Sequence, residues 1–95
     1  MIIETPYKQF DTVTIKTTAG EEVVCRFLEE TDKTITVQKP LALMPTQQGV
    51  GLGPFAFTVH PEAKIKLNKN AILFVHKTEN EMANQYVSST SSIMV

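Results

Sequence analysis

The sequence predicts a mainly β protein: a small, five-stranded antiparallel barrel that is strongly bent and is followed by a short C-terminal helix. Over residues 12–39, apolar residues recur at every second position in three runs, which is the pattern of strands that bury one face. Short polar connections around Gly20 and Asp32 separate the runs, as in consecutive strands that pair antiparallel. The chain has 95 residues, 42% of them hydrophobic, which suits one domain with one small core. We therefore predict a single domain over residues 1–95, with its barrel core at about 10–77.

The first three strands are predicted at residues 12–18, 22–29 and 34–40. The lead-in over residues 1–11 is short and interrupted by Pro6, so we expect an extended segment that begins pairing near Phe10. The second strand is apolar on both faces in its middle, which is typical of a strand inside a curled sheet or at a subunit contact. The third strand should end at Pro40, because proline donates no hydrogen bond to a ladder.

Residues 41–54 break the alternating pattern and are predicted to form a long, apolar loop. This segment holds three glycines and two prolines, and long loops in small domains are often functional or covered by a partner. Two interpretations remain open: the loop folds back over an open end of the barrel, or it contributes to a subunit or ligand contact. The run from Gly49 to Gly53 is not assigned to phosphate binding, because Pro54 and a strand follow it instead of a helix.

Two more strands and a helix are predicted in the remainder of the chain. Residues 55–67 form one long fourth strand bent at Pro61, and residues 71–76 form an apolar fifth strand after a tight polar turn. Thr78 and Glu81 have the spacing of a capping box, which predicts a helix over about 79–87. The polar tail over residues 88–95 is expected to be weakly ordered.

Charge and targeting signals favour a cytoplasmic protein that binds no membrane. The formal net charge of -1 gives no overall attraction to nucleic acid or to anionic lipid, so any such binding requires a local patch. The N-terminus lacks the features of a signal peptide, and no apolar run approaches the ~20 residues of a membrane span. The one cysteine, Cys25, lies on the apolar face of its strand and is expected to be a small buried side chain.

The sequence contains no group of residues typical of an enzyme. Its two histidines, His60 and His76, stand at predicted strand ends, and no pair of residues has metal-ligand spacing. We therefore expect no catalysis, no metal, no cofactor and no small-molecule substrate.

Charges are distributed unevenly along the chain. Residues 63–77 hold four lysines and no acid, whereas residues 21–32 hold five acids and one arginine. One interpretation is a site for the phosphates of single-stranded nucleic acid. The other is a solvated outer face whose lysines discourage aggregation of an edge strand. The chain has a single arginine, Arg26, and no tryptophan to stack on bases, and both facts favour the second interpretation.

The pattern over about residues 10–77 resembles the Sm-like family, the LSm and Hfq proteins, whose small barrel is SH3-like in shape. The family's second motif ends in an aliphatic strand after a short polar turn, and residues 68–75 are similar to it. Departures from the family include Cys25 in place of the usual glycine of the second strand, and Asn68 and Lys69 in place of its Arg-Gly. The apolar positions of the first motif correspond to Val13, Ile15, Val23, Phe27, Ile35 and Val37.

The resemblance implies a homo-oligomeric ring in which the fourth strand of one subunit pairs with the fifth of the next, and which binds single-stranded RNA near its pore. By resemblance, the RNA-binding positions are Asp32, Lys33, Thr34, Asn68, Lys69 and Asn70. The positions at the subunit interface are Phe57, Val59, Ile65, Leu67, Leu73 and Val75. The alternative function is a protein-binding assembly or adaptor module of the same barrel shape. Such a module would use residues 41–54 and the C-terminal helix, and would bind no nucleic acid.

Overall fold

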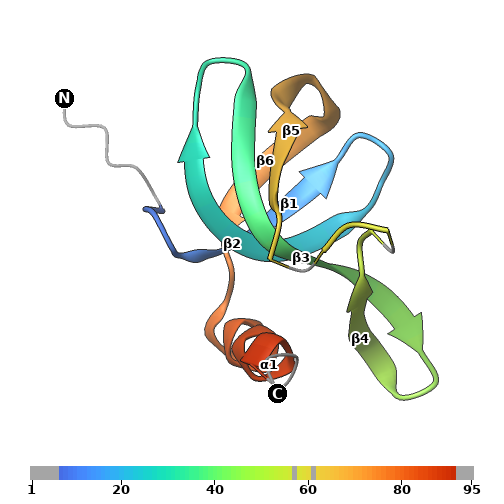
Figure 1. The fold of residues 1–95 in the computed structure, drawn as a ribbon. Helices are drawn as coiled ribbons and strands as arrows, with labels where there is room; N and C mark the ends of the chain where they lie inside the picture. Colours follow the sequence, from blue (N-terminus) through green and yellow to red (C-terminus); the bar gives the residue numbers. More distant parts are fainter. Residues whose placement is uncertain (1–6, 57, 61, 92–95) are drawn as a thin grey trace, which may run out of the picture.

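The protein is a strongly bent antiparallel sheet with one helix beneath it, as Figure 1 shows. The computed structural model describes residues 7–56, 58–60 and 62–91. In chain order the elements are β1 (Thr12–Thr17), β2 (Glu22–Glu30), β3 (Thr34–Thr46), β4 (Gly49–Pro54), β5 (Lys64–Asn68), the 3-10 helix η1 (Lys69–Ala71), β6 (Ile72–Lys77) and α1 (Asn80–Ser91).

The predicted three-stranded meander is confirmed. β1 pairs antiparallel with β2, and β2 with β3, through the turns at Gly20 and Asp32. Gly20 has φ +97°, a conformation that glycine adopts without steric cost. The residues at every second position are buried together and exclude water from the core. The buried cluster consists of Val13, Ile15, Val23, Cys25, Phe27, Ile35 and Val37.

Two irregularities in the pairing of β2 with β3 bend the sheet. In β2, Leu28 is an extra residue between the pairs Phe27↔Val37 and Glu29↔Thr36. In β3, the register shifts again across Lys39 and Pro40. Lys39 has φ 53°, a left-handed conformation that is uncommon outside glycine. Bulges increase the local twist and bend a strand. The sheet therefore curves without a glycine at position 25, where the Sm-like pattern has one and this chain has Cys25.

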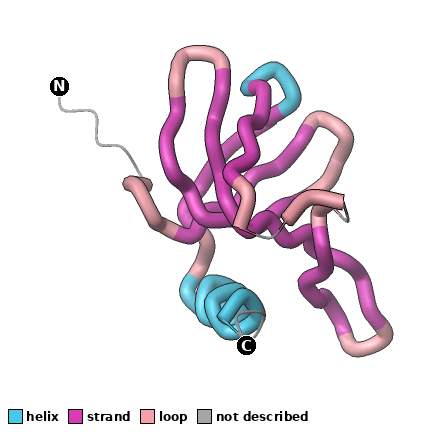
Figure 2. The backbone as a smooth tube through the Cα atoms, in the orientation of Figure 1, coloured by secondary structure: helices cyan, strands magenta, loops and turns pink. Residues whose placement is uncertain are grey.

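The prediction that residues 41–54 form an irregular loop is wrong. β3 continues through Pro40 to Thr46, turns at Gln47 and Gln48, and returns as β4, so these residues form a β-hairpin that we call the arm. Pro40 is tolerated because it lies at the bulge where β3 changes partners, from β5 over its first half to β4 over its second. The arm extends away from the rest of the sheet (Figures 1 and 2).

The predicted fourth strand is much shorter than expected. Only Lys64–Asn68 forms a strand, and the described part of residues 55–63 is irregular, with Phe57 and Pro61 outside the described residues. The turn of η1 leads into β6, which pairs with β1 on the opposite side of the sheet from β5. Within the described chain β5 and β6 do not pair, so the sheet is not closed into a barrel.

The C-terminal helix is present but begins and ends later than predicted. Its N-terminal amides bond to Glu79, whose carboxylate accepts from the backbone N–H of Met82 (2.7 Å), whereas the Thr78 hydroxyl is buried against Thr14 (2.9 Å). The predicted capping box is therefore wrong. Residues 88–91, expected to be weakly ordered, belong to the helix, and residues 92–95 lie outside the described chain.

Tyr86 fastens α1 to the sheet. Its ring is fully buried, and its hydroxyl donates to the carbonyl oxygen of Lys39 at 2.7 Å. Within the described part of the chain, no helix combines the length and the apolar character needed to cross a bilayer.

Candidate nucleic-acid interface

The two loops predicted to bind RNA lie side by side at one end of the sheet. Thr34, at the start of β3, pairs with Asn68, at the end of β5. The backbone N–H of Lys69 donates to the carbonyl of Lys33 at 2.8 Å, which joins η1 directly to the β2–β3 turn. All six predicted positions therefore belong to one surface, although the loops are separated by more than thirty residues in sequence (Figure 2).

Local hydrogen bonds hold both loops in shape. In the β2–β3 turn, the Thr31 hydroxyl accepts from the backbone N–H of Lys33 (3.2 Å) and contacts the Thr34 hydroxyl (2.9 Å). In η1, the Asn68 side chain accepts from the backbone N–H of Asn70 at 2.9 Å. Side chains that bond to nearby backbone stabilise turns in this way, so the polar groups of this surface are held in place before any ligand arrives.

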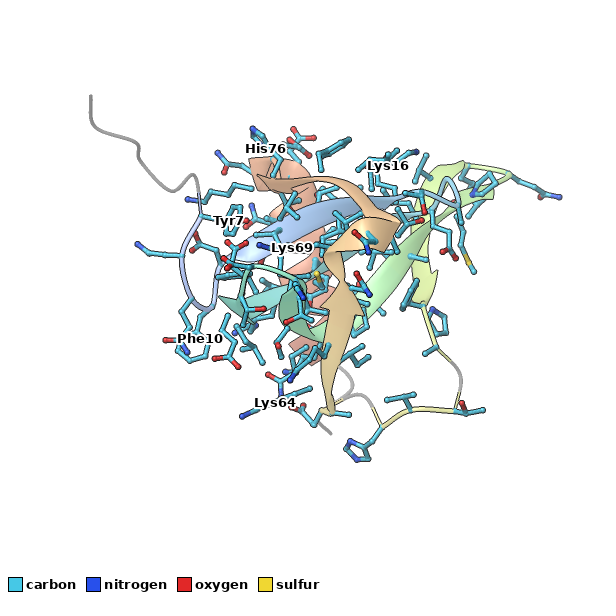
Figure 3. The ribbon with its side chains drawn as sticks, turned by 90° about the horizontal axis from the view of Figure 1, so that it is seen from above. Tyr7, Phe10, Lys16, Lys64, Lys69 and His76 are labelled. Atoms are coloured by element: carbon cyan, nitrogen blue, oxygen red, sulfur yellow. The ribbon has the colours of Figure 1, made fainter. Side chains whose placement is uncertain are left out.

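Lys69 is engaged within the protein. Its ammonium lies 2.8 Å from the carboxylate of Glu30, which also accepts from the hydroxyl of Tyr7 at 2.9 Å. Figure 3 places Tyr7 and Lys69 near each other in the view from above. The hydrogen bond from Lys69, assisted by the one from Tyr7, lowers the pKa of Glu30. Burial, with the Glu30 hydrogen bond, raises the pKa of Tyr7 to about 12.

Sequence reasoning missed Glu30 and Tyr7 as members of this site. The sequence predicts only an extended segment around Tyr7, but its ring packs edge-on against Phe27, with centroids 4.8 Å apart, and brings the hydroxyl to Glu30. The proximity of Glu30 to the predicted turn at Asp32 was the one available signal. With Lys69 neutralised by Glu30, the exposed groups that could meet a phosphate or a base are Lys33, Asn68 and Asn70, beside the carboxylate of Asp32.

The predicted interface residues divide into two groups. Ile65, Leu67 and Val75 pack against the protein's own core, so their side chains do not form an outer apolar surface. Leu73 is 63% exposed, and its neighbour Phe74, which the sequence did not single out, is 50% exposed. Val59 is exposed in an irregular segment, not in a strand, and Phe57 lies outside the described residues.

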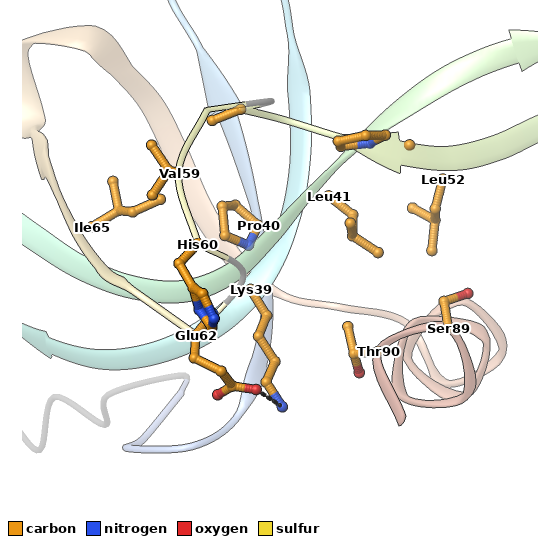
Figure 4. A pocket seen from close by; sticks show the side chains of 13 residues that line it. Lys39, Pro40, Leu41, Leu52, Val59, His60, Glu62, Ile65, Ser89 and Thr90 are labelled. Atoms are coloured by element: carbon orange, nitrogen blue, oxygen red, sulfur yellow. Dashed lines mark hydrogen bonds and ion pairs between the residues drawn. The ribbon is translucent and has the colours of Figure 1, made fainter. Parts of the chain in front are cut away.

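A cavity of about 490 Å³ lies on another part of the molecule, between the base of the arm, the residues before β5 and the end of α1 (Figure 4). Its walls are mainly apolar, with Leu41 and Leu52 on one side and Ile65 on another. The ammonium of Lys39 and the carboxylate of Glu62 lie 3.4 Å apart at its rim. The sequence did not indicate this cavity, because its walls come from segments that only the fold brings together.

Cys25 is buried, and both histidines contact backbone groups close to them in sequence. Cys25 is fully buried, and burial raises its pKa to about 12, which keeps the thiol neutral and unreactive. Nδ1 of His60 accepts from the backbone N–H of Glu62 at 3.0 Å, and Nδ1 of His76 lies 2.8 Å from its neighbour's carbonyl oxygen. No three His, Cys, Asp or Glu side chains among the described residues converge as a metal site would require.

Comparison with known proteins identifies no family for this chain. No protein-family model matches the chain, and no curated protein is similar enough to be matched.

Proposed function

We propose that this protein is a non-catalytic module of the Sm-like kind that assembles into a homo-oligomeric ring and binds single-stranded RNA. The observation that carries the proposal is the order of the strands. β5 and β6 lie at opposite sides of one bent sheet, follow each other in sequence through η1, and leave their outer edges unpaired within the described chain. An unpaired edge is a template for another strand, and a head-to-tail contact that closes on itself generates a ring.

The proposed subunit contact pairs the edge of β5 with the edge of β6 of the next copy. Both strands are short and of similar length, with five and six residues. Leu73 and Phe74 on β6 expose apolar side chains that a neighbouring subunit would cover. Removing this apolar surface from water would stabilise the contact. In the ring, this pairing would join the sheets of neighbouring chains into one continuous sheet.

The assembly is tested by the change Leu73→Lys. The change removes an apolar side chain that the neighbour would cover and places a charge in the proposed contact. The ring should therefore dissociate to one or two chains of 10.6 kDa each, read by light scattering on a sizing column. Because Leu73 is largely exposed, the melting temperature of the isolated chain should change little. The matched control is Val87→Lys, an exposed apolar residue on α1 that should leave the mass unchanged. A wild-type protein of only one or two chains contradicts the ring.

RNA binding is proposed at the end of the sheet that carries Lys33, Asn68 and Asn70. In a ring, copies of this surface would repeat around the axis, which multiplies weak contacts on one strand of RNA. Amide side chains can bond to base edges, and the ammonium of Lys33 can neutralise a phosphate.

The change Lys33→Glu tests this site. Affinity for labelled oligo-U or oligo-A, measured by fluorescence anisotropy, should fall about tenfold, and the salt dependence should become shallower as a phosphate contact is lost. Lys8→Glu makes the same charge change at an exposed position in the lead-in and is the control. An equal loss of affinity in both variants would mean that only the net charge of the protein matters, and the proposed RNA-binding site would be wrong.

A protein-binding adaptor is the second candidate function. The apolar cavity at the base of the arm favours it, because such a cavity suits an apolar side chain of a partner better than a phosphate. If neither oligonucleotide binds at low salt while the ring forms, this function replaces RNA binding.

A further inference from the structure

The arm presents a free strand edge that the proposed ring does not use. β4 pairs with β3 along one side, and its other side has no partner among the described residues. The whole arm from Leu41 to Pro54 contains no charged residue. Proteins usually protect an exposed edge with charges, and the arm lacks this protection.

The two faces of the arm differ sharply. Residues opposite each other in an antiparallel pair share a face of the sheet. The register of β3 and β4 therefore shows on which face of the arm each side chain lies. One face carries the three glycines of β4, and Met44 lies across Gly53 so closely that an added Cβ would be 2.5 Å from its Sδ. The other face is apolar throughout and consists of Leu41, Leu43, Pro45, Val50, Leu52 and Pro54.

The outer part of the arm has little support from its own chain. β2 reaches only Leu41 and Ala42, so from Leu43 onward the arm is a two-stranded ribbon. Two-stranded ribbons are marginal in water, and strands gain stability when three or more pair with a common apolar face. Val50 is 59% exposed and Met44 40% exposed in this outer part.

We propose that β4 pairs antiparallel with β4 of a second copy of this chain, which joins the two arms into one four-stranded sheet. A second copy is the occupant that the charge pattern favours, because two uncharged edges meet without repulsion. The contact is a two-fold one, so it closes at two partners: it joins two rings, or two chains if no ring forms.

The change Val50→Lys tests the contact. It inserts a charge into the proposed strand pair at an exposed position, so the mass by light scattering should fall by half while the melting temperature of the chain changes little. Val87→Lys, equally an exposed valine, is the matched control and should leave the mass unchanged. An unchanged mass in the Val50→Lys protein would overturn the proposal.

Cysteine trapping provides a second measurement that does not rely on a lysine. Leu52 lies near the centre of β4, so two copies of Leu52→Cys should form a disulfide under mild oxidation, while the buried Cys25 does not interfere. Gln47→Cys is the control, because antiparallel pairing moves the two arm tips to opposite ends of the sheet. Equal cross-linking at both positions would exclude the antiparallel arrangement. Leu73→Lys changes β6 and not the arm. It should dissociate the ring, whereas Val50→Lys should only halve the mass, so the two proposed contacts are tested separately.

Discussion

At the scale of single residues, Lys69 shows how the fold changes the role of a side chain. Its place in the polar turn before β6 suggested a phosphate contact, but its ammonium is paired with Glu30 and its backbone fastens η1 to the β2–β3 turn. Tyr7 adds a second hydrogen bond to the same carboxylate. The Lys69, Glu30 and Tyr7 side chains therefore join three separate segments, and the proposed RNA contacts rest on the residues around them.

We predict that Glu30→Gln lowers the free energy of unfolding by about 0.5 kcal/mol at neutral pH, since the ion pair is partly exposed to solvent. The pKa of Glu30 is lower in the folded protein, so its contribution is fully present above the unfolded value of ~4.3 and is lost as pH falls through the folded value. Urea denaturation of both proteins across this pH range measures the difference. The neighbouring Glu29→Gln is the control, because Glu29 forms no ion pair within the described chain. A difference that grows on acidification would contradict the assignment.

At the scale of elements, the bulge at Lys39 and Pro40 has three consequences. It lets β3 exchange β5 for β4 as its partner, it bends the sheet, and it turns the Lys39 carbonyl toward the hydroxyl of Tyr86. The helix is thus anchored at the same place from which the arm departs. Helices as short as the 12 residues of α1 are marginal alone, so this contact holds the helix in its place.

Tyr86→Phe should therefore destabilise the protein by about 1 kcal/mol, because the partly buried carbonyl of Lys39 loses the hydroxyl that donates to it. The ring itself remains buried, so α1 should stay docked and the far-ultraviolet circular dichroism should be unchanged. Urea denaturation gives the magnitude. Val87→Ala, on the exposed side of the same helix, should cost less than about 0.5 kcal/mol. A loss of helical signal in Tyr86→Phe would mean that the hydroxyl alone holds the helix.

At the scale of the whole molecule, three surfaces are available for contacts. The β5 and β6 edges suit ring formation, the turn surface at Lys33 suits a polar ligand, and the arm suits a second copy. The arm and the turn surface lie at opposite ends of the molecule in Figure 1, so joining two rings through their arms would leave the proposed RNA surfaces facing outward. Lys33→Glu should accordingly leave the mass unchanged, and Val50→Lys should leave RNA binding by each ring unchanged.

The sequence by itself determined the strands whose apolar residues alternate, because side chains of period two must share one buried face. β1, β2 and the start of β3 lie close to where this pattern predicts them, and β6 lies close to where a continuous apolar run predicts a strand. It also indicated the turns at Gly20 and Asn68, where local chemistry decides the conformation.

Only the tertiary structure decided the arm, the bends and the network around Lys69. Glycine and proline at residues 40–54 are local signals of a loop, yet the strand passes Pro40 because a bulge there removes the need for its N–H. Glu30, Lys69 and Tyr7 are far apart in sequence and meet because β2, η1 and the lead-in converge at one end of the sheet. Contacts of this kind depend on which strands pair, and the packing of the whole core decides that pairing. No short stretch of sequence is therefore enough to predict them.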